Sequence, residues 1–255
     1  MELKIYTCEE WGAKPPRHPI TAAGRPQRVI DHHTAGHAPR LDASPTESLE
    51  EAKAYARAIQ NHHMSPDPHD PSKPWSDTGQ NFLVSRSGHV LEGRHGSLRA
   101  ISSGRMVVSA HCPGQNSQPG IEHEHFGTED LTPTQQQASI ALHAFICRHT
   151  GIRPTEFYPH KHFFPTECPS PIVERWLPEL KRTVAHELGV RPHPAGGDGG
   201  GGQSTAIPPA FLDWVQWKLG LGVWRGHRGD PHLRPRSAPR VIPKSWWEAL
   251  KRLTR

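Results

Sequence analysis

Two clusters of histidine and cysteine contain the side chains of this chain that are best suited to metal chemistry. His32-His33-Thr34 follows a short apolar stretch, and seven residues separate His160 from Cys168-Pro169. Zinc binds imidazole nitrogen and thiolate sulfur, and a catalytic zinc keeps three protein ligands and one open position. The chain has 20 histidines, most of which must be solvated or structural. The two clusters alone therefore leave a structural role for the histidine pair open.

Short strands are expected around the first cluster. The apolar run from Arg28 to His32 predicts a strand, and residues 82–91 predict a hairpin that turns at Ser85–Gly88. His33 is expected to point to the face opposite His32, because side chains alternate along a strand. It would be packed or hydrogen-bonded there.

Three helices are indicated by capping signals at their N-termini. Ser44–Glu47 fits a capping box with proline at the first helical position, ahead of an apolar face over residues 49–63. Thr132–Gln135 repeats the pattern before a helix that Gly151 is placed to end. Ser170-Pro171 opens the third helix. Helices interspersed with strands around one core predict a mixed α/β domain.

A glycine-rich segment marks the clearest boundary in the chain. It predicts a body at residues 1–190, a linker at 191–206 and a small helical module at 207–255. The module carries ten Lys and Arg against three acids, and the rest of the chain carries 20 against 22. The basic character of the chain therefore belongs to the module, where an anionic partner is expected.

The N-terminal residues and the cysteines bear on where the chain is made. The first residues lack an apolar core and a small-residue cleavage site, so no secretory signal and synthesis in the cytoplasm are expected. No stretch approaches 18 apolar residues, which excludes a transmembrane segment. The four cysteines show no CxxC pairing, so a disulfide framework is not expected.

A series of short motifs occurs in an order and spacing that resemble a known family. The motifs are Cys8-Glu-Glu-Trp11-Gly12, Ile30-Asp31-His32-His33-Thr34, Asp77-Thr-Gly-Gln-Asn81, Glu92-Gly93-Arg94, Ala110-His111-x-x-Gly114-x-Asn116, Gly120-Ile121-Glu122 and His160-x5-Thr166-x-Cys168-Pro169. Over about residues 8–188 the chain resembles the family of type 2 N-acetylmuramoyl-L-alanine amidases and peptidoglycan-recognition proteins.

The resemblance implies a fold, a metal and a reaction. The fold would be a central mixed β-sheet flanked by helices. One Zn²⁺ would be held by His32, His160 and Cys168, and the bond cut would join N-acetylmuramic acid to L-alanine in bacterial peptidoglycan. Zinc would polarise the amide carbonyl and lower the pKa of its bound water to about 7.

The chain departs from common family patterns at the position of the proton-transfer group. Many members place a tyrosine near the metal, where this chain has Gln80, which cannot act as an acid or base. A branch resembling the cytosolic muropeptide-recycling amidases uses the glutamate of a Gly-Ile-Glu segment. Glu122 is therefore the expected general base. The alternative is a glutamate that only orders its loop through hydrogen bonds.

Two further departures fall between the last two ligands. Thr166 stands where some members carry lysine, and its hydroxyl is expected to stabilise the developing oxyanion or, alternatively, to bond its own backbone. His162 stands where the family usually has aspartate. It is an alternative ligand, although the spacing to Cys168 favours His160.

Four residues at motif positions are expected to contact the substrate. They are His111, Asn116, Gln80 and Arg94. Arg94 is equally suited to a structural role.

The module after the linker is rich in tryptophan and arginine. Large aromatics are needed to give so small a module a core, but those left over could bind anionic wall polymers or sugars. The wall-binding candidates are Trp224, Arg225, Arg228, Arg234 and Arg236. No familiar nucleic-acid motif appears, so nucleic acid is not the expected partner.

These features predict a phage or prophage endolysin that reaches the wall through a membrane hole made by a holin-type protein. A cytosolic muropeptide-recycling amidase is an alternative, but that role needs no wall-binding module. A non-catalytic recognition protein is another, although such members typically lose a zinc ligand. A structural zinc would need a fourth ligand, for which His33 and His162 are the candidates.

Overall fold

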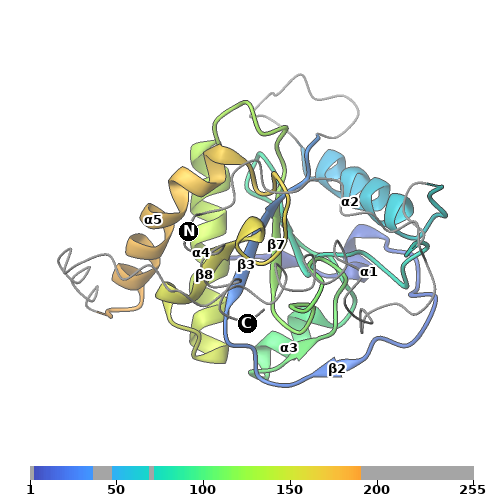
Figure 1. Ribbon diagram of the computed structural model, residues 1–255, viewed down its shortest axis with the longest axis horizontal. Coiled ribbons are helices and arrows are strands. Elements are labelled where there is room, and N and C mark those ends of the chain that lie inside the picture. The colour runs from blue at the N-terminus through green and yellow to red at the C-terminus, as the bar shows by residue number, and fades with distance from the viewer. Residues whose placement is uncertain (1–2, 37–47, 69–71, 191–255) are drawn as a thin grey trace, which may run out of the picture. The chain divides into compact units, whose positions relative to one another are not determined.

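A mixed six-stranded sheet forms the centre of the body (Figure 1). The computed structural model describes residues 3–36, 48–68 and 72–190. The elements of the sheet are β1 (Ile5–Tyr6), β3 (Val29–His33), β4 (Phe82–Val84), β5 (Val90–Glu92), β7 (Gly120–His123) and β8 (Phe157–Pro159). They lie in the order β1-β5-β4-β7-β3-β8. Neighbouring strands are parallel except β4 and β5, which form the predicted hairpin.

Helices and short elements complete the described part of the chain. The helices are α1 (Cys8–Trp11), α2 (Leu49–His63), α3 (Ser97–Ser102), α4 (Pro133–Thr150) and α5 (Ser170–Glu187), with 3₁₀ turns η1 (Pro154–Glu156) and η2 (His160–His162). Strands β2 (Ala22–Ala23) and β6 (Met106–Val107) form a separate antiparallel pair. The segment Lys161–Thr166 does not belong to the compact unit that the rest of the body forms.

The two faces of the sheet pack against different helices. On one face, Val29, Phe82 and Ile121 join a core with the apolar side chains of α4 and α5. On the other, Leu83 and Leu91 pack with residues of α1 and α2. In Figure 1, α4 and α5 lie on one side of the strands and α2 lies on the opposite side. This arrangement confirms the expected α/β fold with a central mixed sheet flanked by helices.

The structure confirms two of the three predicted helix starts, one of them (α5) without a side-chain cap, and corrects the third. Thr132 caps α4, and Gly151 ends it in the left-handed conformation, as predicted. Helix α2, however, begins at Leu49 with the capping box Ser48–Glu51, so the prediction that Ser44–Glu47 caps this helix is wrong. Both serines fit the same local rule, and the one next to the residues that pack against the sheet forms the cap. Residues 44–47 lie outside the described residues.

The described residues also bear on the predictions for the cysteines, for the third helix and for a transmembrane segment. None of the four cysteines, all of which lie in the described residues, forms a disulfide bond, and α5 begins at Ser170 as expected. Among the described residues, no helix is long and apolar enough to span a bilayer. The predicted linker and module, including the wall-binding candidates Trp224 to Arg236, lie outside the described residues.

Candidate metal centre

Three adjacent parallel strands bring the predicted metal-site residues to one edge of the sheet. His32 lies near the carboxyl end of β3, and Glu122 pairs with it in register on β7. His160 directly follows β8, the strand on the other side of β3. The carboxyl ends of neighbouring parallel strands meet at one edge, where open α/β sheets commonly bind ligands.

The donor atoms of His32, His160 and Cys168 form a group that could hold a metal ion. One donor atom from each residue lies within 4.8 Å of the others, and the group has three members among the described residues. His32 Nδ1 lies 3.6 Å from Cys168 Sγ. Tetrahedral zinc bonds to nitrogen and sulfur would place these two atoms about 3.6 Å apart. The donor types and their spacing therefore fit zinc.

The strand after His32 also supports the cysteine. The backbone N–H of His33 donates to Cys168 Sγ at 3.4 Å. The His33 ring packs beside that of His125, with ring centroids 5.3 Å apart. His33 is thus packed rather than part of the donor group, which agrees with the expectation from strand alternation.

Burial sets the charge of the three donors. It lowers the pKa of His32 well below its usual value and that of His160 to about 3, so both imidazoles are neutral at pH 7. Burial raises the pKa of the Cys168 thiol, against a smaller opposing effect of the His33 N–H. A metal ligand must be deprotonated, so metal binding has to release the thiol proton.

The environment of Glu122 differs from that of an ordinary surface glutamate. It is partly buried on β7, and burial raises its pKa from 4.5 to about 8. No hydrogen bond to its carboxyl group is found among the described residues. A carboxyl group that can exchange a proton near neutral pH, placed next to a metal site, is suited to general acid–base chemistry.

His111 lies beside His32. Its Nδ1 is 2.8 Å from His32 Nε2, and its Nε2 is 2.9 Å from the carbonyl oxygen of Gln118. Asn116 closes the loop that carries His111, because its Oδ1 accepts from the backbone N–H of Cys112 at 2.9 Å. Sequence reasoning placed His111 and Asn116 at the substrate, and that role stays a prediction.

A buried polar network that the sequence analysis missed lies behind β3. His123 Nδ1 donates to the carbonyl oxygen of His32 at 3.0 Å, and its Nε2 lies 2.8 Å from Ser139 Oγ. His143 Nε2 lies 3.2 Å from Asp31 Oδ1, and both side chains are fully buried. A signal existed, because an aspartate inside an apolar strand needs a buried partner, and Ser139 and His143 are polar residues one turn apart on a core helix.

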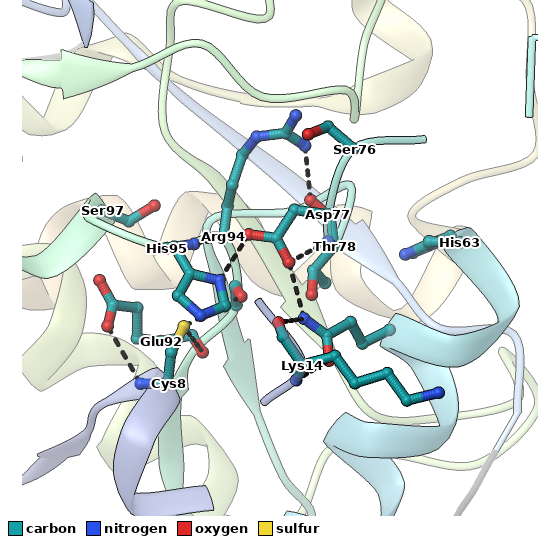
Figure 2. A network of polar contacts seen from close by, with 12 residues as sticks. Cys8, Lys14, His63, Ser76, Asp77, Thr78, Glu92, Arg94, His95 and Ser97 are labelled. Atoms are coloured by element: carbon teal, nitrogen blue, oxygen red, sulfur yellow. Dashed lines mark hydrogen bonds and ion pairs between the residues drawn. The ribbon is translucent and has the colours of Figure 1, made fainter. Parts of the chain in front are cut away.

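The loop that carries Gln80 is held by a second network (Figure 2). The Asp77 carboxylate accepts hydrogen bonds of 2.8 Å from Gln60 Nε2, from the backbone N–H of Thr78 and from both the backbone and Nδ1 of His95. Arg94 Nη1 donates to the carbonyl oxygen of Thr78 at 2.7 Å. Figure 2 shows Asp77 between His95 and Thr78, with Arg94 reaching the same loop.

The structure also shows where the predicted site residues Arg94, Gln80 and Thr166 lie. Arg94 is 6% exposed and holds a backbone carbonyl, which is a structural contact. Gln80 is 2% exposed, and its Oε1 has no hydrogen-bond partner among the described residues. Thr166 lies in the segment Lys161–Thr166, which does not belong to the compact unit of the body. The roles of all three toward substrate stay predictions.

A comparison with family models matches residues 22–171 to Amidase_2, described as N-acetylmuramoyl-L-alanine amidase. Peptidoglycan-recognition protein SC2 of Drosophila melanogaster is 29% identical over 170 residues, which cover 66% of this chain and 80% of that protein. The three donor residues lie inside the matched range.

Solved structures with the same fold include recognition proteins and an endolysin. The complex of tracheal cytotoxin with the ectodomains of peptidoglycan recognition proteins LCa and LCx matches with a TM-score of 0.55 and 28% identity, covering 68% of this chain and 96% of that chain. The endolysin amidase LysCS from Clostridium intestinale matches with a TM-score of 0.50 and 22% identity, covering 74% and 97%. The second likeness shows the fold alone.

Proposed function

The chain belongs to the N-acetylmuramoyl-L-alanine amidase family, and we propose that it is a zinc-dependent hydrolase of the amide bond between N-acetylmuramic acid and L-alanine in peptidoglycan. The observation that carries the proposal is the donor group of His32, His160 and Cys168. Its spacing fits tetrahedral zinc. When bound, zinc supplies a positive charge and Lewis acidity, which polarise the amide carbonyl and acidify water and a nearby carboxyl group.

Glu122 moves the proton in this reaction. Its carboxylate takes a proton from the attacking water as the water oxygen bonds to the lactyl carbonyl carbon. The same proton then passes to the nitrogen of L-alanine as the C–N bond breaks, so that a carboxylic acid and a free amine leave the site. Support comes from its register opposite His32 and from a pKa that burial raises to about 8.

Thr166 is the proposed donor to the oxyanion. The assignment follows from its place two residues before Cys168. One hydroxyl donor in such a position contributes roughly 3 kcal/mol to transition-state stabilisation. His111, Asn116, Gln80 and Arg94 are proposed as substrate contacts on the motif positions that they occupy.

The biological setting is proposed as that of a phage or prophage endolysin. The basic, tryptophan-rich residues 207–255 and the glycine-rich segment before them support a wall-binding module joined by a linker. The candidates Trp224, Arg225, Arg228, Arg234 and Arg236 would bind peptidoglycan or anionic wall polymers. The protein would act on the cell wall after holin-type release.

A recognition protein that binds peptidoglycan without cutting it is the second candidate. The curated relative is itself a peptidoglycan-recognition protein by name. Gln80, which cannot transfer a proton, occupies the position of the family tyrosine. Against this candidate stands the complete set of three donor residues.

Cell-wall digestion separates the two candidates. Purified protein is incubated with isolated walls, with and without a zinc chelator, and the new ends are identified by mass spectrometry. Glu122→Ala is run beside Glu10→Ala, a control glutamate on α1 far from β7 in sequence. Free L-alanine amino termini that disappear with chelator and with Glu122→Ala support the amidase. Binding to walls without new ends would refute it and favour a recognition protein.

A further inference from the structure

The His111 ring is hydrogen-bonded on both of its nitrogens. Nε2 faces the carbonyl oxygen of Gln118 at 2.9 Å. A carbonyl oxygen can only accept, so this nitrogen carries the proton. A neutral imidazole has a single N–H, and the contact of this partly buried ring with two uncharged groups disfavours its charged form. His111 Nδ1 therefore presents a lone pair.

That lone pair determines the proton position on His32. His111 Nδ1 lies 2.8 Å from His32 Nε2. Two lone pairs cannot share a hydrogen bond, so His32 Nε2 carries the proton that lies between the rings. His32 Nδ1 is left as a lone pair, and it is the atom that lies 3.6 Å from Cys168 Sγ.

We infer that His111 is a positioning residue that holds His32 in the tautomer and ring orientation in which Nδ1 binds the metal. The chain of hydrogen bonds runs from the Gln118 carbonyl through His111 to His32. This inference rests on the proposed function, because it concerns the same three-donor group. Groups that orient metal-bound histidines typically change metal affinity by about 10- to 100-fold when they are removed.

The packing of the His111 ring supports a dedicated position. A Cβ atom at Gly120 would lie 2.5 Å from Cγ of His111, far inside contact distance. Only glycine leaves room for the ring over the first residue of β7. Gly120 is itself held by Asn81, whose Oδ1 accepts from its backbone N–H at 2.9 Å. The ring meets His32 edge-on, with an interplanar angle of 85°.

Two substitutions of His111 separate the hydrogen bond from the ring. His111→Asn places a carbonyl oxygen near the position of Nδ1, where it can still accept from His32. His111→Leu removes the acceptor and keeps an apolar side chain of similar bulk. His149→Leu, which changes an exposed histidine on α4, is the matched control.

Two measurements are made on each full-length protein. Zinc affinity is determined by competition with a chromophoric chelator. The proton positions on His32 are determined by ¹⁵N NMR of the zinc-free protein. We expect unaltered protein and His149→Leu to show His32 protonated on Nε2. His111→Leu should bind zinc about 10- to 100-fold more weakly, with a mixture of His32 tautomers, and His111→Asn should recover most of the loss.

The failures of the two proposals can be told apart. Unaltered protein that binds no zinc would overturn the proposed metal centre. Normal zinc affinity in His111→Leu, with His32 still protonated on Nε2, would overturn the inference alone. If His111→Leu does not fold, Gly120→Ala tests the same point, because it displaces the ring but keeps its hydrogen-bonding atoms. Unchanged zinc affinity in a folded Gly120→Ala would likewise overturn the inference.

Discussion

Replacing Glu122 by glutamine should make the zinc-free protein more stable and should strongly reduce the proposed amidase activity. Burial raises the pKa of Glu122 from 4.5 to about 8. A carboxyl group whose pKa is higher in the folded state destabilises the fold progressively as pH rises from 4.5 to about 8. Each pH unit in that interval costs about 1.4 kcal/mol. At pH 7 the penalty amounts to up to about 3 kcal/mol, which a neutral glutamine of similar shape removes.

Urea unfolding of the zinc-free proteins at several pH values measures this difference. At pH 4 the two proteins should have nearly the same free energy of unfolding. The advantage of Glu122→Gln should grow up to about pH 8 and then level off. Wall digestion by the zinc-loaded proteins should fall by about 10²- to 10⁴-fold, the usual contribution of a general base.

Glu10→Gln is the control for this experiment. The pKa of Glu10 is lowered, chiefly because its carboxylate accepts from the backbone N–H of Thr7. Its substitution should therefore bring no gain in stability at neutral pH. A loss of stability in Glu122→Gln at pH 7, or a gain that does not depend on pH, would refute the conclusion that burial of the Glu122 carboxylate destabilises the fold. Full activity in the variant would refute its role as the base.

Three further perturbations test the site and the loops around it. Zinc should raise the thermal midpoint of the unaltered protein but not that of Cys168→Ser; equal stabilisation would rule out Cys168 as a ligand. The hydrogen bond to Asp77 raises the pKa of His95. The stability that this bond to the charged imidazole contributes is therefore complete below pH 6.5 and is lost as pH rises through the folded-state pKa of His95. Asp77→Asn should thus cost about 3 kcal/mol near pH 6 and less at pH 9 in urea unfolding, and a constant cost would contradict this. A Cβ at Gly93 would lie 2.7 Å from a backbone carbonyl oxygen, whereas one at Gly24 would contact nothing within 4 Å. Gly93→Ala should therefore lose about 1–3 kcal/mol and Gly24→Ala little by the same measurement, and equal losses would be inconsistent with the packing.

Local patterns in the sequence predicted β3, the hairpin of β4 and β5, and the helices α2, α4 and α5. The hairpin of β4 and β5, the cap at Thr132 and the end of α4 at Gly151 depend on groups within a few residues of one another. Such interactions join residues that are close together in the sequence, so they can be recognised before the fold is known. The error at Ser44–Glu47 has the same origin, because Ser48–Glu51 offers an equivalent local signal and only packing distinguishes the two.

The identity of the three donor residues could also be predicted from the sequence. Their types suit zinc, and their motif positions match a known family, whose model covers residues 22–171. The structure then brings His32 and Cys168, 136 positions apart in sequence, to 3.6 Å. The spacing of motifs gave the residues but not the atoms that face the metal.

The tertiary structure alone determined how the site is oriented and what surrounds it. The sequence contains no local sign that Glu122 pairs in register with His32, or that His111, 79 residues away, hydrogen-bonds to its Nε2. The buried contact between Asp31 and His143 is likewise formed only when α4 packs on the sheet. These features depend on strand register and on packing between distant segments. A shift of one residue in the register of β3 would turn Asp31 and His32 to the opposite faces of the sheet.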